Sequence, residues 1–265
     1  EELVAGGVLN GYQLSAPFES FKDMGHQTGI IFYTEAAYTS TTDPVTGFRK
    51  NVYISNAAPV KKLEEKIKLF NVIGWDEKKQ SYFFTYDPVN FFDKKEKIKS
   101  VGKVWTVYAD VPRIRRERGE DGIWTARDVN PNEMLKSLFE TWNFGGAKSV
   151  DIKMEIVEKM KGGELNAYKV FDGRERNFLQ ALIYIFNIIL DIRNSSDKVD
   201  FIASPVSPFF TTLNAPKPNS CDINLVNGDS LGAYNIARKG IIVLKRIKEN
   251  AEKPDLFISK NDWDT

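Results

Sequence analysis

Carboxylates and guanidinium groups are the side chains of this sequence that could carry out chemistry, because the common alternatives are almost absent. The 265 residues contain one cysteine, Cys221, and one histidine, His26. A single cysteine excludes an intramolecular disulfide and a four-thiolate zinc cluster. A single histidine excludes paired-imidazole mechanisms and leaves a serine–histidine triad one candidate base. Any reaction must therefore use Asp, Glu, Lys or Arg side chains.

Asp229 is the first candidate, since it stands before an amphipathic helix that the apolar spacing predicts over about 231–250. An aspartate in this position accepts hydrogen bonds from free backbone amides and complements the helix dipole, which is an ordinary structural role. The same carboxylate could instead bind a divalent cation, because Mg²⁺ prefers oxygen ligands. Position in the sequence alone favours the structural role.

Arg193 and Asp200 are the second candidates. Arg193 ends a predicted buried helix over about 174–193. A planar guanidinium group meets phosphate oxygens in bidentate fashion and stays charged, so Arg193 could hold a polyanion. The alternative is that Arg193 only complements the end of its helix and pairs with a nearby acid such as Asp197 or Asp200.

The elements that must position these residues alternate between helical and strand patterns, which predicts a mixed α/β fold. Strands are predicted over 28–33, 81–86, 104–109 and 256–258, further helices over 18–24 and 60–70, and a Pro-Gly turn over 43–47. The basic runs 94–99 and 113–118 are interpreted as exposed loops. Of Trp75, Trp105 and Trp124, most are expected to be buried, although an indole can stack on a base.

The formal net charge is +1. This falls short of the strongly basic character of a free-standing nucleic-acid binder, so a polyanion would be met locally. No secretory signal pattern opens the chain. The longest apolar run, 178–192, is too short and too polar to span a bilayer. We therefore expect a cytoplasmic protein that is not in the membrane.

Four motifs follow one another along the chain. Tyr-Gln-Leu-Ser-Ala-Pro-Phe begins at residue 12, and Thr-Ser-x-x-Asp-Pro-x-Thr-Gly-Phe begins at residue 39. The third motif has two parts, Asp-Ile-Arg-Asn-Ser at 191–195 and Asp-Phe-Ile-Ala-Ser-Pro-Val at 200–206. The fourth, Asp-x-x-Gly-Ala-Tyr-Asn-Ile-Ala, begins at Asp229. In this order they resemble the RuvC and Nuc segments of type V-A CRISPR RNA-guided DNA endonucleases, the Cas-twelve-a family.

The resemblance implies a ribonuclease-H-like RuvC portion that an inserted Nuc domain interrupts. Residues 1–38 would end the second RuvC segment, 39–224 would form Nuc, and 225–265 would form the third RuvC segment. It implies that Asp229 is one of three carboxylates that hold two Mg²⁺ ions for phosphodiester hydrolysis. It also implies that Arg193 contacts the DNA strand near the scissile phosphate, with Asp200 beside it.

The implied partners are target DNA and, through the rest of the full-length protein, a CRISPR RNA. The family acts as a monomeric effector in prokaryotic antiviral defence and is used in genome editing. Sequence specificity would come from the guide RNA.

The chain departs from the family pattern at several positions. Leu231 replaces an asparagine, and Asn227 replaces an acidic residue. Thr41 stands where the family has lysine, which would remove one phosphate contact. Thr211-Thr212-Leu213 replaces Asp-Ser-Arg, so contacts made there in the family do not carry over.

Three alternatives remain at this point. A TnpB-like transposon nuclease shares the last RuvC motif, but its Cys-x-x-Cys zinc ribbon needs more than one cysteine. A non-catalytic nucleic-acid-binding or scaffold domain fits an incomplete carboxylate set. A small-molecule α/β enzyme lacks support, since no Gly-rich phosphate loop or nucleophile elbow is present.

The first prediction follows from the carboxylate count. The family's other two RuvC carboxylates lie upstream of the segment at residue 12, and Glu1 and Glu2 do not have their sequence context. We therefore expect the isolated chain to lack Mg²⁺-dependent DNase activity, because one aspartate cannot hold two metal ions. A fluorescent single-stranded DNA cleavage assay measures this. Robust Mg²⁺-stimulated cleavage that Asp229→Ala abolishes would contradict it.

Overall fold

The computed structural model describes residues 36–44, 46–50, 58–87, 104–141, 151–196, 199–206, 227–250, 255, 257–258 and 262. The chain forms two compact units, one comprising Glu1–Ser40 with Asp229–Thr265 and the other comprising Thr41–Gly228. Several sequence predictions lie outside the described residues: the helix over 18–24, the strand over 28–33, the run 94–99, His26, Thr211-Thr212-Leu213 and Cys221.

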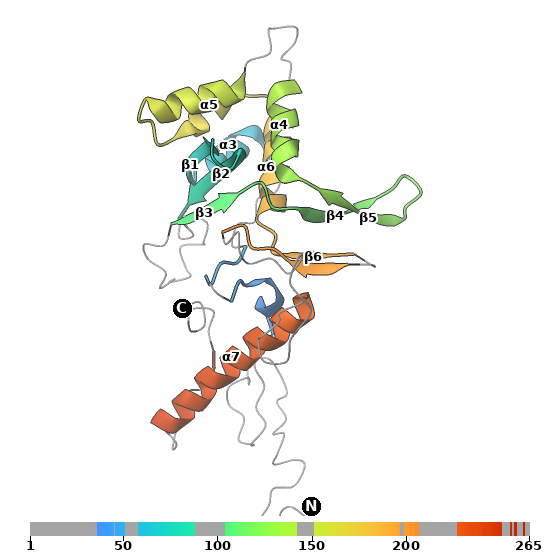
Figure 1. The fold of residues 1–265 in the computed structure, drawn as a ribbon, viewed down its shortest axis with the longest axis vertical. Coiled ribbons are helices and arrows are strands. Elements are labelled where there is room, and N and C mark those ends of the chain that lie inside the picture. Colours follow the sequence, from blue (N-terminus) through green and yellow to red (C-terminus); the bar gives the residue numbers. More distant parts are fainter. Residues whose placement is uncertain are drawn as a thin grey trace, which may run out of the picture. The chain divides into compact units, whose positions relative to one another are not determined.

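The unit Thr41–Gly228 combines helices with antiparallel strands, so the fold is mixed α/β as predicted (Figure 1). In chain order its described elements are α3 (Val60–Ile67), β1 (Phe70–Asp76), β2 (Ser81–Tyr86), β3 (Trp105–Tyr108), β4 (Arg113–Arg118), β5 (Trp124–Val129), α4 (Pro131–Thr141), α5 (Ile152–Lys161), the 3-10 helix η4 (Ala167–Phe171), α6 (Arg176–Ile189), β6 (Arg193–Ser195) and β7 (Asp200–Ile202). The strands form three antiparallel groups in the orders β1-β2-β3, β4-β5 and β6-β7.

Helix α6 is the centre of this unit, as its apolar sequence predicts. Eight of its side chains are buried, and Phe186 packs against the sheet. The Phe186 ring centroid lies 5.0 Å from that of Phe70 on β1 and 4.5 Å from that of Phe84 on β2. Aromatic pairs of this kind add to the stability that burial of apolar area provides. The position of the end of α6, and of the residues that follow it, is thereby fixed by the core.

The structure agrees with several local predictions. Strands occur at 81–86 and 105–108, and the Asp43 turn is present, with Gly47 at a φ of 73° that glycine adopts without strain. The Asp43 carboxylate accepts hydrogen bonds from the Thr46 backbone N–H at 3.3 Å and from the Thr46 hydroxyl at 2.7 Å. This side chain closes the turn.

Two local predictions in this unit are wrong. The helix expected over 60–70 ends at Ile67, and Phe70 begins β1. Pairing with β2 and burial of Phe70 against α6 override the helical spacing of this segment. The run 113–118 is not a loop but strand β4, which pairs with β5 from Arg113↔Val129 to Arg118↔Trp124. The arginines of β4 are therefore divided between the two faces of a ribbon, with Arg113 and Arg115 on one face and Arg116 and Arg118 on the other.

Arg113 is fully enclosed although it was expected in an exposed loop, because it binds the carbonyl end of α6. Its Nε donates to the Ile188 carbonyl at 3.3 Å, its Nη2 to the Ile189 carbonyl at 3.0 Å, and its Nη1 to the Pro112 carbonyl at 3.1 Å. The Ile188 and Ile189 carbonyls lie in the last turn of α6, where carbonyls lack partners within the helix, and a cation complements the negative end of its dipole. The Ile188 carbonyl also accepts from the Asp191 backbone N–H at 3.2 Å. Burial lowers the pKa of Arg113 to about 10, which leaves it charged at neutral pH.

The other unit contains α7 from its second residue onward; the helix spans Gly228–Glu249 and starts three residues before the predicted 231. Its core joins Val243 to Ile258, with Tyr38, Ile242 and Ile247 packed around them. The strand predicted over 256–258 is wrong at Phe257 and Ile258, which the structure describes outside any strand. The Phe257 carbonyl accepts a hydrogen bond from Arg246 at 2.6 Å. A side chain thus takes the place of a neighbouring strand.

Across the described residues, no helix combines the length and the apolar character that crossing a bilayer would need.

The second prediction concerns Arg113. Replacement by methionine keeps apolar volume but removes the Arg113 donor of the Ile189 carbonyl and leaves the Ile188 carbonyl with the Asp191 backbone N–H, so we expect unfolding free energy to fall by about 2–4 kcal/mol. Urea denaturation followed by far-UV circular dichroism measures the change. Arg118→Met, at an exposed position of the same strand, is the matched control and should change stability by less than about 0.5 kcal/mol. Equal losses in the two variants would contradict the helix-capping role.

Candidate functional site

Asp229 lies in the first turn of α7, and its side chain is exposed. Because the helix begins at Gly228, Asp229 is a helical residue and does not precede the helix as the sequence pattern implied. A carboxylate in the first turn is stabilised by the positive end of the helix dipole. Its exposure means that a cation or a solvent molecule can reach it.

The motif that begins at Asp229 has residues on two faces of α7: Asp229 is exposed, and other residues of the motif lie on a buried face. Leu231, Asn235 and Lys239 recur every four residues and are all buried. The Asn235 side-chain amide donates to the Thr39 carbonyl at 2.7 Å, and Lys239 Nζ donates to the Ala37 carbonyl at 3.4 Å. This face of α7 thus holds the segment 36–40 of the same unit. Leu231, where the family has asparagine, sits in an enclosed position that suits an apolar side chain.

Arg193 and Asp200 meet in the other unit and form a two-point ion pair. Arg193 Nε donates to Asp200 Oδ1 at 3.3 Å, and Nη2 donates to Asp200 Oδ2 at 3.0 Å. The side chains are 30% and 22% exposed. They are brought together because Arg193 is the first residue of β6, not the end of α6, and β6 pairs with β7 with Ser195 opposite Asp200. The pairing alternative considered from the sequence is therefore present, with Asp200 as the acid.

Gly228 completes this arrangement. Its backbone N–H donates to Asp200 Oδ2 at 3.1 Å, so one carboxylate oxygen binds both Arg193 and the chain at the start of α7. A Cβ atom at residue 228 would overlap the Nε, Cδ and Cζ atoms of Arg193. Only glycine leaves room for the guanidinium beside this backbone. Sequence reasoning did not single out Gly228, because nothing in the sequence distinguishes close approach from a turn.

The neighbours of Arg193 in its motif have structural roles. Asp191 forms an ion pair with Lys50 at 2.7 Å. Asn194 is buried, accepts a hydrogen bond from the Ile114 backbone N–H at 3.0 Å, and donates to the Ile192 carbonyl at 3.0 Å. These bonds tie β6 to the end of α6 and to β4. Arg193 is the cationic residue of this motif. Its guanidinium is partly exposed and is held by the Asp200 carboxylate.

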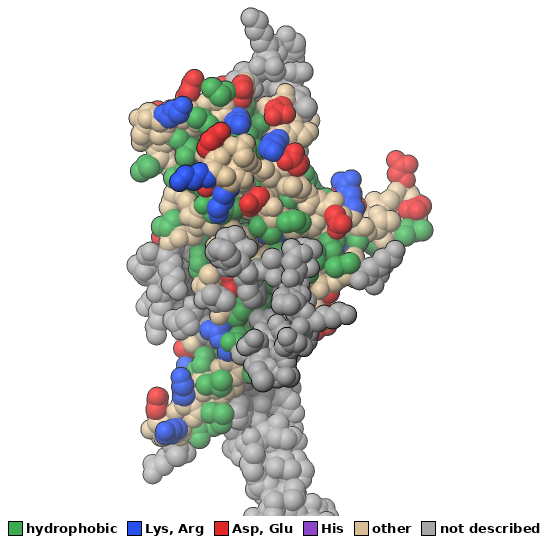
Figure 2. Space-filling view, in the orientation of Figure 1, with side chains coloured by type: hydrophobic (Ala, Val, Ile, Leu, Met, Phe, Trp, Pro, Cys, Tyr) green, Lys and Arg blue, Asp and Glu red, His purple; other side chains and the backbone are tan. Residues whose placement is uncertain are grey.

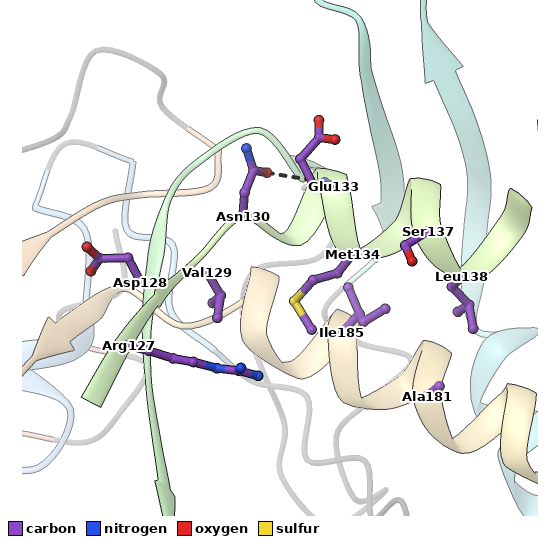
Figure 3. Close-up of a pocket in the computed structure, with 10 residues that line it drawn as sticks. All are labelled: Arg127, Asp128, Val129, Asn130, Glu133, Met134, Ser137, Leu138, Ala181 and Ile185. Atoms are coloured by element: carbon purple, nitrogen blue, oxygen red, sulfur yellow. Dashed lines mark hydrogen bonds between the residues drawn. The ribbon is translucent and has the colours of Figure 1, made fainter. Parts of the chain in front are cut away.

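An open groove of about 600 Å³ lies elsewhere in the same unit, where β5 and α4 meet α6 (Figure 3). Its floor is apolar and includes Met134, Leu138, Ala181 and Ile185, while polar groups such as Glu133 stand at its rim. The lining holds neither a histidine nor a cysteine, and its two carboxylates, Asp128 and Glu133, point away from the floor. The groove therefore does not have the donors of a catalytic or metal centre.

A family model described as a RuvC nuclease domain matches residues 1–264. The chain belongs to the RuvC nuclease family. A RuvC nuclease hydrolyses the phosphodiester bonds of nucleic acid, which agrees with a site built from carboxylates and arginine rather than histidine or cysteine. RuvC nucleases typically use divalent metal ions. The carboxylates of this chain are therefore the side chains to consider as metal ligands.

The described residues do not by themselves fit the metal requirement of a RuvC site. Among them, no three His, Cys, Asp or Glu side chains are grouped closely enough to hold a metal ion. Asp229 is a suitable oxygen donor, but a two-metal site needs several such donors. The Asp200 carboxylate is already engaged by Arg193 and Gly228. Further ligands would have to come from outside the described residues.

The third prediction tests the close approach at Gly228. Gly228→Ala should push Arg193 away from Asp200 and lower the unfolding free energy by about 1–3 kcal/mol, as overpacking does. Gly240→Ala, also in α7, is the matched control, since a Cβ atom there meets nothing within 4 Å. That variant should be neutral or stabilised by up to about 1 kcal/mol.

Urea unfolding measures both variants, and the NMR signal of the Arg193 Nε–H group reports the ion pair directly. If Gly228→Ala left that signal and the stability unchanged, the tight contact between residue 228 and the guanidinium would be refuted.

Proposed function

We propose that this chain is the C-terminal nuclease portion of a type V-A CRISPR RNA-guided DNA endonuclease. In this proposal Asp229 supplies one of three carboxylates to a metal-dependent RuvC site, and the unit Thr41–Gly228 is the Nuc domain that positions the DNA strand. Membership of the RuvC family supports the nuclease part. The order of the four sequence motifs supports the CRISPR part.

The observation that carries the proposal is the exposed carboxylate of Asp229 in the first turn of α7. The opposite face of the helix is anchored through Asn235 and Lys239, so the carboxylate is presented from a rigid element. A metal ion that it helps to hold would supply charge stabilisation to the reacting phosphate. The chain's own part is to fix this oxygen donor in place.

Arg193 has the proposed role of binding a phosphate of the target strand. Asp200 accepts hydrogen bonds from Nε and Nη2 along one edge of the guanidinium and so restricts its rotation, which lowers the entropy lost when a phosphate binds. The side chain remains partly exposed. Arg193 is thus a binding residue and Asp200 the residue that positions it.

A second candidate function is non-catalytic binding of nucleic acid. It is favoured by the lack of a three-ligand group among the described residues. The two functions differ in their response to Mg²⁺: binding alone would depend on salt, be insensitive to Mg²⁺, and be weakened by Arg193→Ala. They are compatible if the chain binds and the complete protein cuts.

The fourth prediction tests the role of Asp229 in the full-length protein with guide RNA and target DNA. Asp229→Asn keeps the side-chain shape but removes the negative charge, so Mg²⁺-dependent cleavage should fall roughly a thousandfold or more. Gel-based cleavage kinetics measure the rate, and filter binding measures DNA affinity, which should stay within about threefold because positioning contacts are unchanged. The matched control is Asp172→Asn, whose carboxylate forms only a surface pair with Lys68 at 3.4 Å.

Cleavage by Asp229→Asn at a rate close to that of the control would refute a ligand role for Asp229. Loss of binding in parallel with cleavage would instead assign Asp229 to DNA contact.

A further inference from the structure

The β4–β5 ribbon carries an exposed indole. Trp124 is 63% exposed and its neighbour Ile123 is 61% exposed, whereas Trp75 in the β1-β2-β3 sheet is only 6% exposed. The ribbon projects away from α4 and α6 (Figure 1), and Trp124 is one of the five exposed residues of β5. An indole displayed in this way is accessible to another molecule, and its ring can stack on an aromatic partner.

The strand register places arginines on the same face as this indole. Residues directly opposite each other in an antiparallel pair share a face, and here Arg118 stands opposite Trp124 and Arg116 opposite Ala126. Arg116, Arg118 and Trp124 are all exposed. Ala126 has the smallest side chain of this set and is exposed, and Asp128, opposite Ile114, is the acidic residue of the same face of β5.

The face is held in position by bonds to the rest of the unit. Arg116 Nε donates to the Ser195 carbonyl at 3.3 Å, and Arg118 Nε donates to the Gly122 carbonyl at 3.1 Å. The Ile114 backbone N–H is bound by Asn194 at 3.0 Å. Through these contacts β4 runs beside β6, the strand that begins with Arg193. Arg116 is thereby bound to Ser195, two residues along β6 from Arg193.

We propose that this face, made of Arg116, Arg118 and Trp124, binds single-stranded nucleic acid that extends from Arg193. The proposal rests on the proposed function, because it takes nucleic acid as the substrate. A single strand exposes the faces of its bases, on which an indole can stack, and its phosphates, which guanidinium groups bind. A duplex buries its base faces in the stack and would leave Trp124 without a partner. The contact does not select a sequence, since every base has a stacking face.

The opposite face of the ribbon is already engaged within the protein. Arg115 donates to the Tyr184 hydroxyl at 3.1 Å, and Arg127 forms an ion pair with Glu117 at 2.9 Å. The acidic residues Glu120 and Asp121 belong to the turn beyond the last strand pair, where Figure 2 shows acidic side chains at the outer end of the ribbon. Since these acids offset part of the positive charge, stacking on Trp124 should contribute more than charge to the affinity.

The fifth prediction uses the 265-residue chain and a fluorescein-labelled oligothymidylate of about 20 nucleotides, a length that covers several stacking and phosphate contacts. Fluorescence anisotropy is measured in EDTA, so that no cleavage occurs. Trp124→Ala should weaken binding about tenfold, and Trp124→Phe should recover most of that loss, because an aromatic ring still stacks. Arg118→Gln should weaken binding about threefold at low salt and less at high salt.

Two controls match these changes. Leu165→Ala truncates another highly exposed apolar side chain, 75% exposed in the same unit, and Lys61→Gln removes one positive charge from an exposed position of α3. Each should alter the dissociation constant by no more than about twofold. Circular dichroism shows whether the variants remain folded.

The proposal is overturned if the chain does not bind the oligothymidylate, if Trp124→Ala binds it as wild type does, or if Trp124→Ala and Leu165→Ala weaken binding equally. If Trp124→Ala bound the oligothymidylate with the affinity of the wild type, a protein would replace nucleic acid as the partner expected for the ribbon. The two proposals fail separately: binding of the oligothymidylate is measured in EDTA, where no cleavage occurs, whereas the cleavage rate of Asp229→Asn in the full-length protein tests catalysis.

Discussion

The candidate site of the larger unit depends on the hydrogen bonds that the Asp200 carboxylate accepts. This carboxylate binds the guanidinium of Arg193 through two hydrogen bonds and the backbone of Gly228 through a third. An arginine held in this way keeps its charge while losing rotational freedom, which suits the binding of a phosphate. The absence of a side chain at residue 228 is part of the same arrangement, since any Cβ atom would occupy the position of the guanidinium.

A layered core supports this pair. Phe186 fixes α6 against the sheet, Arg113 binds the carbonyls at the end of α6, and Asn194 ties β6 to β4. Buried polar groups of this kind have all their partners within the unit, so they specify one arrangement of the strands that follow α6. The exposed cations of the ribbon and of β6 then act from a rigid frame. This division between buried anchors and exposed cations agrees with a nuclease domain, because its nucleic-acid substrate is a polyanion.

The sequence predicted the parts of the fold that follow from apolar periodicity, and it failed where tertiary pairing decides. Strand β2 was predicted correctly, and helix α6 was predicted in the right place but too long, since it ends at Ile189 and Arg193 begins β6. Strand β4 was missed because Ile114 is its only apolar residue, and the pairing with β5 leaves no local signal. Burial of Arg113 was missed for the same reason. In the candidate site, the pairing of Arg193 with Asp200 was among the alternatives weighed. The requirement for glycine at 228 depends on a contact across 35 positions of sequence, from 193 to 228, and had no local signature.

The central claim is that the Asp229 carboxylate is a metal ligand in a RuvC site. Anomalous diffraction from crystals of the full-length protein grown with Mn²⁺, guide RNA and target DNA tests it most directly, because Mn²⁺ replaces Mg²⁺ at oxygen sites and its position can be located. The account predicts an anomalous peak at about 2.1–2.2 Å from an Asp229 carboxylate oxygen, a distance typical of oxygen ligands. Mn²⁺ bound beside the scissile phosphate without Asp229 in its coordination shell would contradict it.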